Sequence, residues 1–388
     1  MRKKLSVPKN VLFLGIVSFF NDVASEMIYP VMPIFLTSVL GAPASILGFI
    51  EGFAEATASI MKFISGYISD KMQKRKGFVI CGYGLSAISK IIIALATTWP
   101  MVLVAKFIDR FGKGIRTTAR DSLLLENTTP TDKGFIFGFH RALDSLGAFV
   151  GPIIALILLS IYHDNIRIIF HLAIIPPIIG LGALILFVRE KKKEKKPQQV
   201  FSFHFSWKIF DPRFKLFLVS SIIFSLGNSS DAFLILRSKE LGLTTTLIVG
   251  TYILYNLFQT LFATPAGELA DRIGPKRVYS MGLVIFALVY FVFGLMKNPI
   301  LIWIMYPIYG MYIAFTDGVS KAYLSEFTTK ETSGSYFGFY QTVIAFCTFF
   351  ASFFGGILWT KFFSGATFYY GAVMALLAFG VLKTSRLK

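Results

Sequence analysis

Unbroken apolar runs of about 20 residues recur along the chain, and they limit its possible folds more than any other feature. Such a run is long enough to cross the hydrocarbon core of a bilayer as a helix. Hydrophobic residues make up 55% of the 388 residues and charged residues only 15%. Soluble domains carry about 25% charged residues. The sequence therefore excludes an ordinary soluble enzyme and indicates a polytopic membrane protein with short loops.

Twelve such runs predict an all-α membrane protein with twelve transmembrane helices in two six-helix bundles. The first six are expected at residues 11–39, 44–69, 78–97, 101–123, 134–160 and 168–188. The second six are expected at 214–236, 246–266, 278–296, 300–323, 335–358 and 363–382. The predicted domains are an N-terminal bundle, a basic and aromatic cytoplasmic linker, and a C-terminal bundle, at residues 1–188, 189–213 and 214–388.

The distribution of Lys and Arg predicts how the chain is oriented. With a cytoplasmic N-terminus, the inner loops and tails hold about 27 basic residues and the outer loops about 5. An excess of Lys and Arg is typical of cytoplasmic loops. We therefore expect both termini in the cytoplasm. The net charge of +18 then points to anionic lipid headgroups as partners rather than to nucleic acid.

The two sets of helices are also related in sequence. Residues 124–139 and 324–339 are identical at eight of sixteen positions. A second pair of similar segments, 66–71 and 267–272, follows the second and eighth predicted helices. Because an even number of helices separates the members of each pair, the repeats share one orientation. Parallel repeats with a binding site near the midplane are typical of secondary transporters.

The second pair of segments resembles the signature of the major facilitator superfamily, a Gly followed by an Asp with a basic neighbour and then by a basic cluster. The two copies contain Gly66, Asp70, Lys71, Gly267, Asp271 and Arg272. The resemblance covers the whole chain. It implies a monomeric transporter that works by alternating access, without a cofactor, in the inner membrane of a bacterium.

The resemblance further implies that this motif latches the inner side of the protein in one conformation. Its Asp would meet a positive helix N-terminus or an Arg, and its basic cluster would meet anionic headgroups. The alternative is a positive-inside loop whose Asp ends a helix. The candidate latch residues are Gly66, Asp70, Lys71, Arg75, Arg116, Arg120, Asp121, Gly267, Asp271, Arg272, Lys276 and Arg277.

The fifth predicted helix contains Gly147, Gly151 and Pro152, which resemble part of a signature of drug antiporters in the superfamily. Small residues at this spacing allow a close helix contact, and the proline favours a bend. A plain helix contact without any antiporter role is the alternative.

Ionisable residues inside predicted spans point to a cavity, because a charge that faces lipid is costly. A carboxylate in a water-poor site can take up and release a proton near neutral pH. The proton-coupling candidates are Asp22, Glu26, Asp109 and Asp144. Static salt bridges between helices are the alternative for each of them.

Further polar and aromatic residues are candidates for lining a substrate cavity. Polar contacts between helices, without a substrate, are the alternative. The candidates are Asn21, Glu51, Glu55, Lys90, Lys106, Arg110, Arg141, Asn228, Asp231, Tyr252, Tyr255, Asn256 and Gln259.

Two transport functions fit these patterns. The first is proton antiport that exports lipophilic or amphiphilic compounds, favoured by the acidic first helix and the partial antiporter signature. The second is proton-coupled transport of an anionic solute, such as an organic acid or a siderophore, favoured by the buried cations. A scaffold without transport would be expected to lose the buried charges. The short loops argue against an enzyme.

Energy is expected to come from an ion gradient, because the chain has no phosphate-binding loop for ATP. Four scattered His and two Cys predict no metal site.

Overall fold

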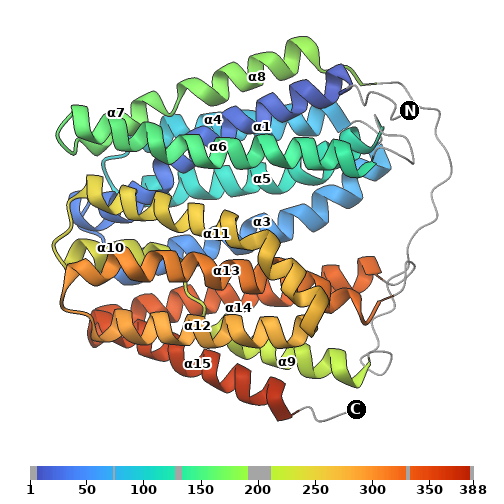
Figure 1. Ribbon diagram of the computed structural model, residues 1–388. Helices are drawn as coiled ribbons and strands as arrows, with labels where there is room; N and C mark the ends of the chain where they lie inside the picture. The colour runs from blue at the N-terminus through green and yellow to red at the C-terminus, as the bar shows by residue number, and fades with distance from the viewer. Residues whose placement is uncertain (1–6, 73–74, 127–132, 191–210, 329–332, 385–388) are drawn as a thin grey trace. The chain divides into compact units, whose positions relative to one another are not determined.

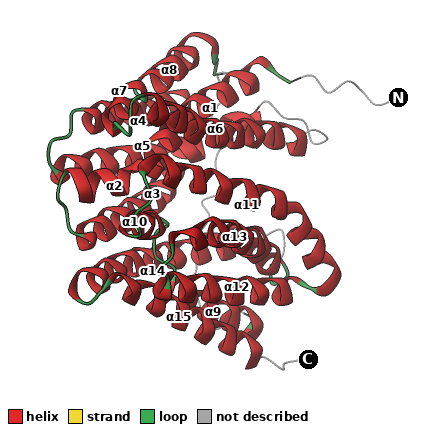
Figure 2. Cartoon of the chain, turned by 60° about the vertical axis from the view of Figure 1, so that its left-hand side comes forward, coloured by secondary structure: helices red, strands yellow, loops and turns green. Residues whose placement is uncertain are grey.

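The structure is a computed structural model that describes residues 7–72, 75–126, 133–190, 211–328 and 333–384. Within these ranges the regular elements are all helices (Figures 1 and 2). The predicted all-α membrane fold is confirmed.

The chain divides into two compact units. Unit 1 comprises Met1–Leu40 and Ala56–Pro197, and unit 2 comprises Gly41–Glu55 and Gln198–Lys388. Helix α3 (Ala44–Met72) therefore contributes to both units. Residues 41–55 were predicted to belong to the first bundle, and this division differs by that segment.

Unit 1 is built from long helices that run back and forth. Helix α1 packs on α6 and α8, and α4 packs on α5. Before α3 it contains α1 (Lys9–Ile28) and the short α2 (Met32–Ile34). After α3 it contains α4 (Arg75–Ala94), α5 (Trp99–Glu126), α6 (Lys133–Ile161), α7 (Ile166–Leu172) and α8 (Ile175–Phe187).

Unit 2 repeats this arrangement. Helix α11 packs on α13, α12 on α13 and α15, and α15 on α9. Its helices are α9 (Pro212–Gly227), α10 (Ala232–Glu240), α11 (Thr245–Ile273), α12 (Pro275–Leu295), α13 (Ile302–Ser325), α14 (Ser333–Lys361) and α15 (Ser364–Thr384).

The helix bounds extend the repeat seen in the sequence. Helices α4 and α6 begin 200 residues before α12 and α14, and α3 and α11 are both 29 residues long. Residues that are 200 apart can therefore be compared directly in α4–α6 and α12–α14.

Three predicted helices are interrupted, and the prediction of continuous helices was wrong there. The first changes to a 3-10 turn at Tyr29–Val31 and to a π-helical segment at Phe35–Val39. The sixth is split into α7 and α8 before Pro176 and Pro177. Proline supplies no N–H to the helical hydrogen-bond ladder and clashes with the preceding turn.

The seventh predicted helix is split between α9 and α10. Helix α9 ends at Gly227, and Asn228 caps it with a non-helical backbone. Helix α10 starts again after Asp231, which is its N-cap residue. Gly and Asn are typical residues at helix ends, and the apolar pattern alone did not reveal this break.

Eleven helical segments in the described part of the chain are long and apolar enough to cross a membrane. The exception among the twelve predicted spans is α5, which is 28 residues long and carries eight charged side chains. Charges of this density are stable at membrane depth only where they pair or face a polar cavity. Helix α5 therefore marks the polar interior of unit 1.

Glycines bring helices close together in both units. A Cβ atom at Gly147 or Gly151 of α6 would lie 2.6 Å from a backbone oxygen of α1. Helix α6 continues through Pro152 to Ile161. In unit 2, a Cβ atom at Gly52 would lie 2.7 Å from the carbonyl oxygen of Phe349. This contact with α14 places the first part of α3 in unit 2.

Candidate functional site

Two cavities lie inside unit 1, and both are lined by Asp22, Lys113 and Arg116. The first cavity has a volume of about 70 Å³ and the second about 330 Å³. Together they are lined by the cationic side chains Lys62, Lys90, Lys106, Arg110, Lys113, Arg116, Arg120 and Arg141. Their acidic side chains are Asp22, Glu26, Asp109 and Asp144. The lining thus has twice as many cationic as acidic groups.

The first cavity contains a buried ion pair between α4 and α5. The Lys90 Nζ lies 3.0 Å from the Asp109 Oδ1, and Lys90 is only 3% exposed. The Ser89 hydroxyl also donates to this oxygen, at 3.3 Å. The Lys106 ammonium lies 5.6 Å from the centre of the Tyr29 ring. The contacts of Asp109 favour the static salt bridge over proton coupling.

The second cavity is organised by Arg120. Its guanidinium donates to the Ser18 hydroxyl at 3.1 Å and to Asp121 at 3.0 Å. It also lies 3.9 Å from Asp144, which is 3.6 Å from the Nδ1 atom of His140. The arginine holds α1, α5 and α6 around one polar layer.

Arg116 lies between the two cavities. It is 5% exposed, its guanidinium lies 4.5 Å from the centre of the Tyr83 ring, and it donates to the Ser86 hydroxyl. Arg116 is one of the predicted latch residues. It is buried in unit 1, because α5 turns this side chain toward α4.

Asp22 lines both cavities and accepts no hydrogen bond or ion pair from another described residue. The charges that act on it are Asp144, Lys113, Arg116 and Arg120. Asp22 is thus a half-buried carboxylate that lies in the field of several cations without a direct bond to any described one. Glu26 lines only the first cavity.

Several buried polar atoms of unit 1 have no hydrogen-bond partner among the residues that the structure describes. The Asn21 side chain is 1% exposed, and neither its oxygen nor its nitrogen is hydrogen-bonded. The same holds for the Tyr83 hydroxyl, the His140 Nε2 and one oxygen of Asp144. Atoms of this kind are satisfied by water or by a ligand. These groups give the interior of unit 1 several positions where water or a ligand would be bound, and one of them, Asp144, lines the second cavity.

The interior of unit 2 is built from tyrosines around one carboxylate. The hydroxyl of Tyr309 donates to Asp231 at 2.6 Å and that of Tyr255 at 3.2 Å. The Tyr309 ring also lies near those of Tyr290 and Tyr312, at centroid distances of 6.3 and 5.0 Å. These residues form the tyrosine cluster of unit 2: Tyr255, Tyr290, Tyr309 and Tyr312.

The remaining candidates for lining a substrate cavity lie apart from the ion pair of unit 1 and the carboxylate of Asp231. Glu51 is buried in unit 2 and acts on Asp231 as a like charge. Glu55 and Arg141 are exposed, although Arg141 lines the second cavity. Tyr252 packs against Tyr255 at 5.4 Å. The half-buried candidates are Asn228, Asn256 and Gln259.

The sequence-based candidates left out several residues that line the cavities or bind a candidate residue. Lys62 and Lys113 line the cavities, and Tyr309 binds Asp231, yet none was selected. The spacing of Lys113 from Lys106 and Asp109 on one face of α5 was a usable indication. For Tyr309, the sequence of one chain did not show which face of α13 meets α10.

Part of the predicted latch can be placed. The side chains of Gly66, Asp70 and Lys71 lie outside the described residues. Arg75 forms an ion pair with Glu126, and its backbone N–H donates to Glu190. In the second copy Gly267, Asp271, Arg272 and Arg277 are exposed, and Lys276 is half-buried. A Cβ at Gly267 would meet nothing within 4 Å, so no close helix contact requires a glycine there.

Within the described ranges, no group of three or more His, Cys, Asp or Glu is arranged to hold a metal ion.

The comparisons with known proteins agree with this architecture. The family model described as Major Facilitator Superfamily matches residues 14–254 and 216–386. An uncharacterized MFS-type transporter of Methanocaldococcus jannaschii is 34% identical over 95% of this chain and 93% of its own length. The quinolone resistance protein NorA of Staphylococcus aureus is 23% identical over 57% of this chain and 55% of its own length.

Solved structures show the same fold. The nucleoside transporter NupG has a TM-score of 0.78 at 14% identity, over 96% of this chain and 99% of its own. A peptide transporter named POT has a TM-score of 0.79 at 14% identity, over 99% of this chain and 95% of its own.

Proposed function

Because the chain belongs to the major facilitator superfamily, we propose that it is a secondary transporter that carries a small anionic solute together with protons. The observation that carries this proposal is the lining of the unit 1 cavities, with eight cationic and four acidic side chains. Cationic side chains in a site of low dielectric attract anions far more strongly than they do in water.

Asp22 is the proposed proton carrier. When it is ionised, it occupies the field of Lys113 and Arg116 and repels an incoming anion. When a proton neutralises it, both cations are available to the solute. Proton and anion therefore favour each other's binding, which is the thermodynamic condition for symport.

The proposed setting is the inner membrane of a bacterium, with both termini in the cytoplasm. The excess of Lys and Arg in the inner loops supports this orientation. A monomer is sufficient, because both cavities are formed within unit 1.

Export of lipophilic compounds by proton antiport is the second candidate. It is favoured by the relatives named for drug resistance, NorA and the multidrug resistance protein MdtH of Photorhabdus laumondii. The tyrosine cluster of unit 2 gives it a physical basis, because aromatic rings around a carboxylate suit a cationic amphiphile.

Proteoliposomes with a pH-sensitive dye in the lumen distinguish these candidates. Organic acids, iron-chelating siderophores and lipophilic cations are added outside, one at a time. Acidification of the lumen by an anionic solute is the result expected for symport. Alkalinisation by a lipophilic cation, with no response to any anion, would overturn the proposal in favour of antiport.

A pair of variants tests the role of Asp22. Asp22→Asn should bind the anion without pH dependence and move no protons with it. Asp317→Asn is the matched control, because Asp317 is exposed and forms an ion pair with Lys321 on the same helix at 3.2 Å. Full proton-linked transport by Asp22→Asn would show that another group carries the proton.

A further inference from the structure

The two cavities of unit 1 follow one another along α5. Lys106, Lys113 and Arg120 succeed each other on this continuous helix at intervals of seven residues. The first cavity is lined by Lys106 and Lys113, and the second by Lys113 and Arg120. A helix rises about 1.5 Å per residue, so two groups that occupied the two cavities would lie about 10 Å apart along α5.

Positive charge is in excess in both cavities. Lys113, Arg116 and Asp22 line both of them. Of the side chains that line one cavity only, the first cavity has three cationic against two acidic, and the second has three against one. Uncompensated charge is costly where water is scarce. One anionic group would compensate one cavity and leave the other with its excess.

The cavities differ in size and in exposure. The first, at about 70 Å³, has room for roughly two waters at about 30 Å³ each, which suits a carboxylate group. Every residue that lines it is buried or half-buried. The second, at about 330 Å³, includes the exposed Lys62 and Arg141 in its wall. The second cavity is therefore the more accessible of the two.

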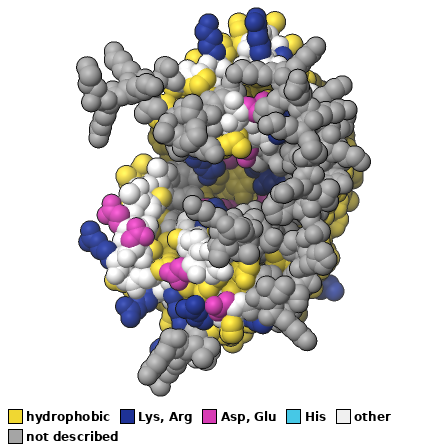
Figure 3. All heavy atoms as spheres, turned by 90° about the vertical axis from the view of Figure 1, so that its right-hand side faces the viewer, with side chains coloured by type: hydrophobic (Ala, Val, Ile, Leu, Met, Phe, Trp, Pro, Cys, Tyr) yellow, Lys and Arg dark blue, Asp and Glu magenta, His cyan; other side chains and the backbone are white. Residues whose placement is uncertain are grey.

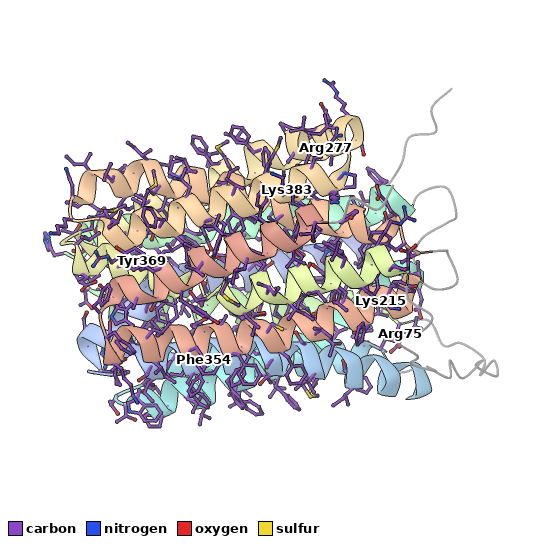
Figure 4. All side chains as sticks on the ribbon, turned by 90° about the horizontal axis from the view of Figure 1, so that it is seen from below. Arg75, Lys215, Arg277, Phe354, Tyr369 and Lys383 are labelled. Atoms are coloured by element: carbon purple, nitrogen blue, oxygen red, sulfur yellow. The ribbon has the colours of Figure 1, made fainter. Side chains whose placement is uncertain are left out.

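The second cavity also lies nearer the basic end of unit 1. Arg75 pairs with Glu126, the last residue of α5, and Arg120 lies six residues before Glu126. Figure 4 shows Arg75 at one end of the helices. Figure 3 faces this end and shows Lys and Arg side chains on its surface. A positive surface potential raises the local concentration of anions, so an anion that arrives here meets the second cavity before the first.

Building on the proposed transport of an anion, we propose that the solute is an extended dianion whose two anionic groups occupy the two cavities. One group would lie between Lys106 and Lys113, and the other beside Arg120, with the linking chain passing Asp22. An ionised Asp22 would repel both groups. Its protonation removes that repulsion and allows the dianion to span both cavities.

The test compares three probes that separate charge from length. C–C bonds of about 1.5 Å make an extended chain of about nine carbons span about 10 Å. Azelate is a linear dicarboxylate of this length, and both of its carboxylates are ionised at pH 7. Its monomethyl ester has nearly the same length but one charge, and succinate has two charges on a shorter chain.

The thermal unfolding midpoint of the purified full chain in neutral detergent is followed at pH 7 as each probe is added. We expect azelate to bind at least about tenfold more tightly than its monomethyl ester, a difference of about 1.4 kcal/mol. Azelate should also bind more tightly than succinate, because succinate is too short to place a carboxylate in each cavity.

Two variants each remove a cation from one cavity. Lys106→Gln changes the first cavity and Arg141→Gln the second. Each should reduce the preference for azelate over its monomethyl ester. Circular dichroism establishes that the variants are folded, and the exposed position of Arg141 protects at least that one from misfolding. Lys383→Gln is the matched control, because Lys383 is exposed and lines neither cavity.

The outcomes separate this inference from the proposed function. Equal affinities for azelate and its monomethyl ester, or tighter binding of succinate than of azelate, would overturn the extended dianion. Anion transport would survive that result if anions still acidified the lumen of proteoliposomes. If no anion acidified the lumen, the proposed function would fail, and the dianion with it.

An unchanged preference for azelate in both folded cavity variants would also overturn the extended dianion, because the two cavities would then not hold its two ends.

Discussion

The two units have matching helices but opposite kinds of interior. At an offset of 200, the ion pair of Lys90 and Asp109 in unit 1 corresponds to Tyr290 and Tyr309 in unit 2. Further along α5 and α13, Arg116 corresponds to Thr316. Unit 1 thus places charges where unit 2 places hydroxyls and rings.

This difference shows that a repeated backbone does not impose repeated chemistry. The helix–helix contacts recur, as at Gly82 and Gly282, where an added Cβ would lie within 2.6 Å of the neighbouring helix. The buried charges do not recur, because Lys90, Asp109 and Arg116 correspond to Tyr290, Tyr309 and Thr316. Proton and anion binding can therefore be concentrated in one unit while the other supplies an aromatic surface. The following experiments test that division.

The largest expected effect is on the buried ion pair. Lys90→Met leaves Asp109 charged and buried, which should destabilise the protein by about 3–5 kcal/mol. Adding Asp109→Leu removes the unpaired charge and should recover most of the lost stability. Thermal unfolding in detergent measures both. If the double variant were no more stable than the single one, the charge of Asp109 would not be the cause.

The next largest expected effect is the loss of stability when Asp231 of unit 2 loses a hydrogen bond. Tyr309→Phe removes the hydroxyl that donates to Asp231 at 2.6 Å, at a cost of about 1.5–3 kcal/mol for a hydrogen bond to a charged group. Proton-linked transport should continue, because the proposed carrier lies in unit 1. If Tyr309→Phe were fully expressed but lost proton coupling, the coupling site would have to lie in unit 2.

A tenfold effect is expected at the junction of the two cavities. Arg116→Gln removes one of the cations that line both, and should raise the solute concentration for half-maximal uptake about tenfold, or about 1.4 kcal/mol. Lys321→Gln is the control, since its side chain is 55% exposed and pairs with Asp317. Equal effects of the two substitutions would mean that surface charge, and not the cavity, attracts the solute.

The smallest effect is at the helix starts. Asp211 caps α9, whereas Pro8 at the start of α1 has no side-chain cap. Asp211→Ala should cost about 0.5–1 kcal/mol. The hydrogen bond from Arg213 holds the pKa of Asp211 below its ordinary value of 3.8. This stabilisation is therefore complete above about pH 4. It is lost as the pH falls through the lowered pKa, and unfolding curves at pH 3 and pH 6 would show the difference.

The fold was largely predictable, because apolar runs of membrane length occur in any helix that faces lipid. The breaks at Pro30 and at Asn228 were missed, since hydropathy averages over a window and does not register one absent hydrogen bond. The charged α5 was predicted as a span at residues 101–123, and the structure has it as a helix over Trp99–Glu126.

The sequence predicted which residues line the candidate site better than it predicted which of them pair with each other. Asp22, Lys90 and Arg110 were selected because charges inside a span need a polar environment, and all three line a cavity. The pairing of Lys90 with Asp109 and the burial of Arg116 depend on how α4 and α5 rotate about their axes. A single sequence does not determine how the two helices are rotated.

The cationic lining of unit 1 also bears on the insulation of the membrane. Transporters operate beside ion gradients that would dissipate through any continuous hydrated path. A positive potential raises the electrostatic barrier for Na⁺ and K⁺, as fixed positive charges do in selective pores. The same side chains that are proposed to bind an anionic solute would thus limit cation leak.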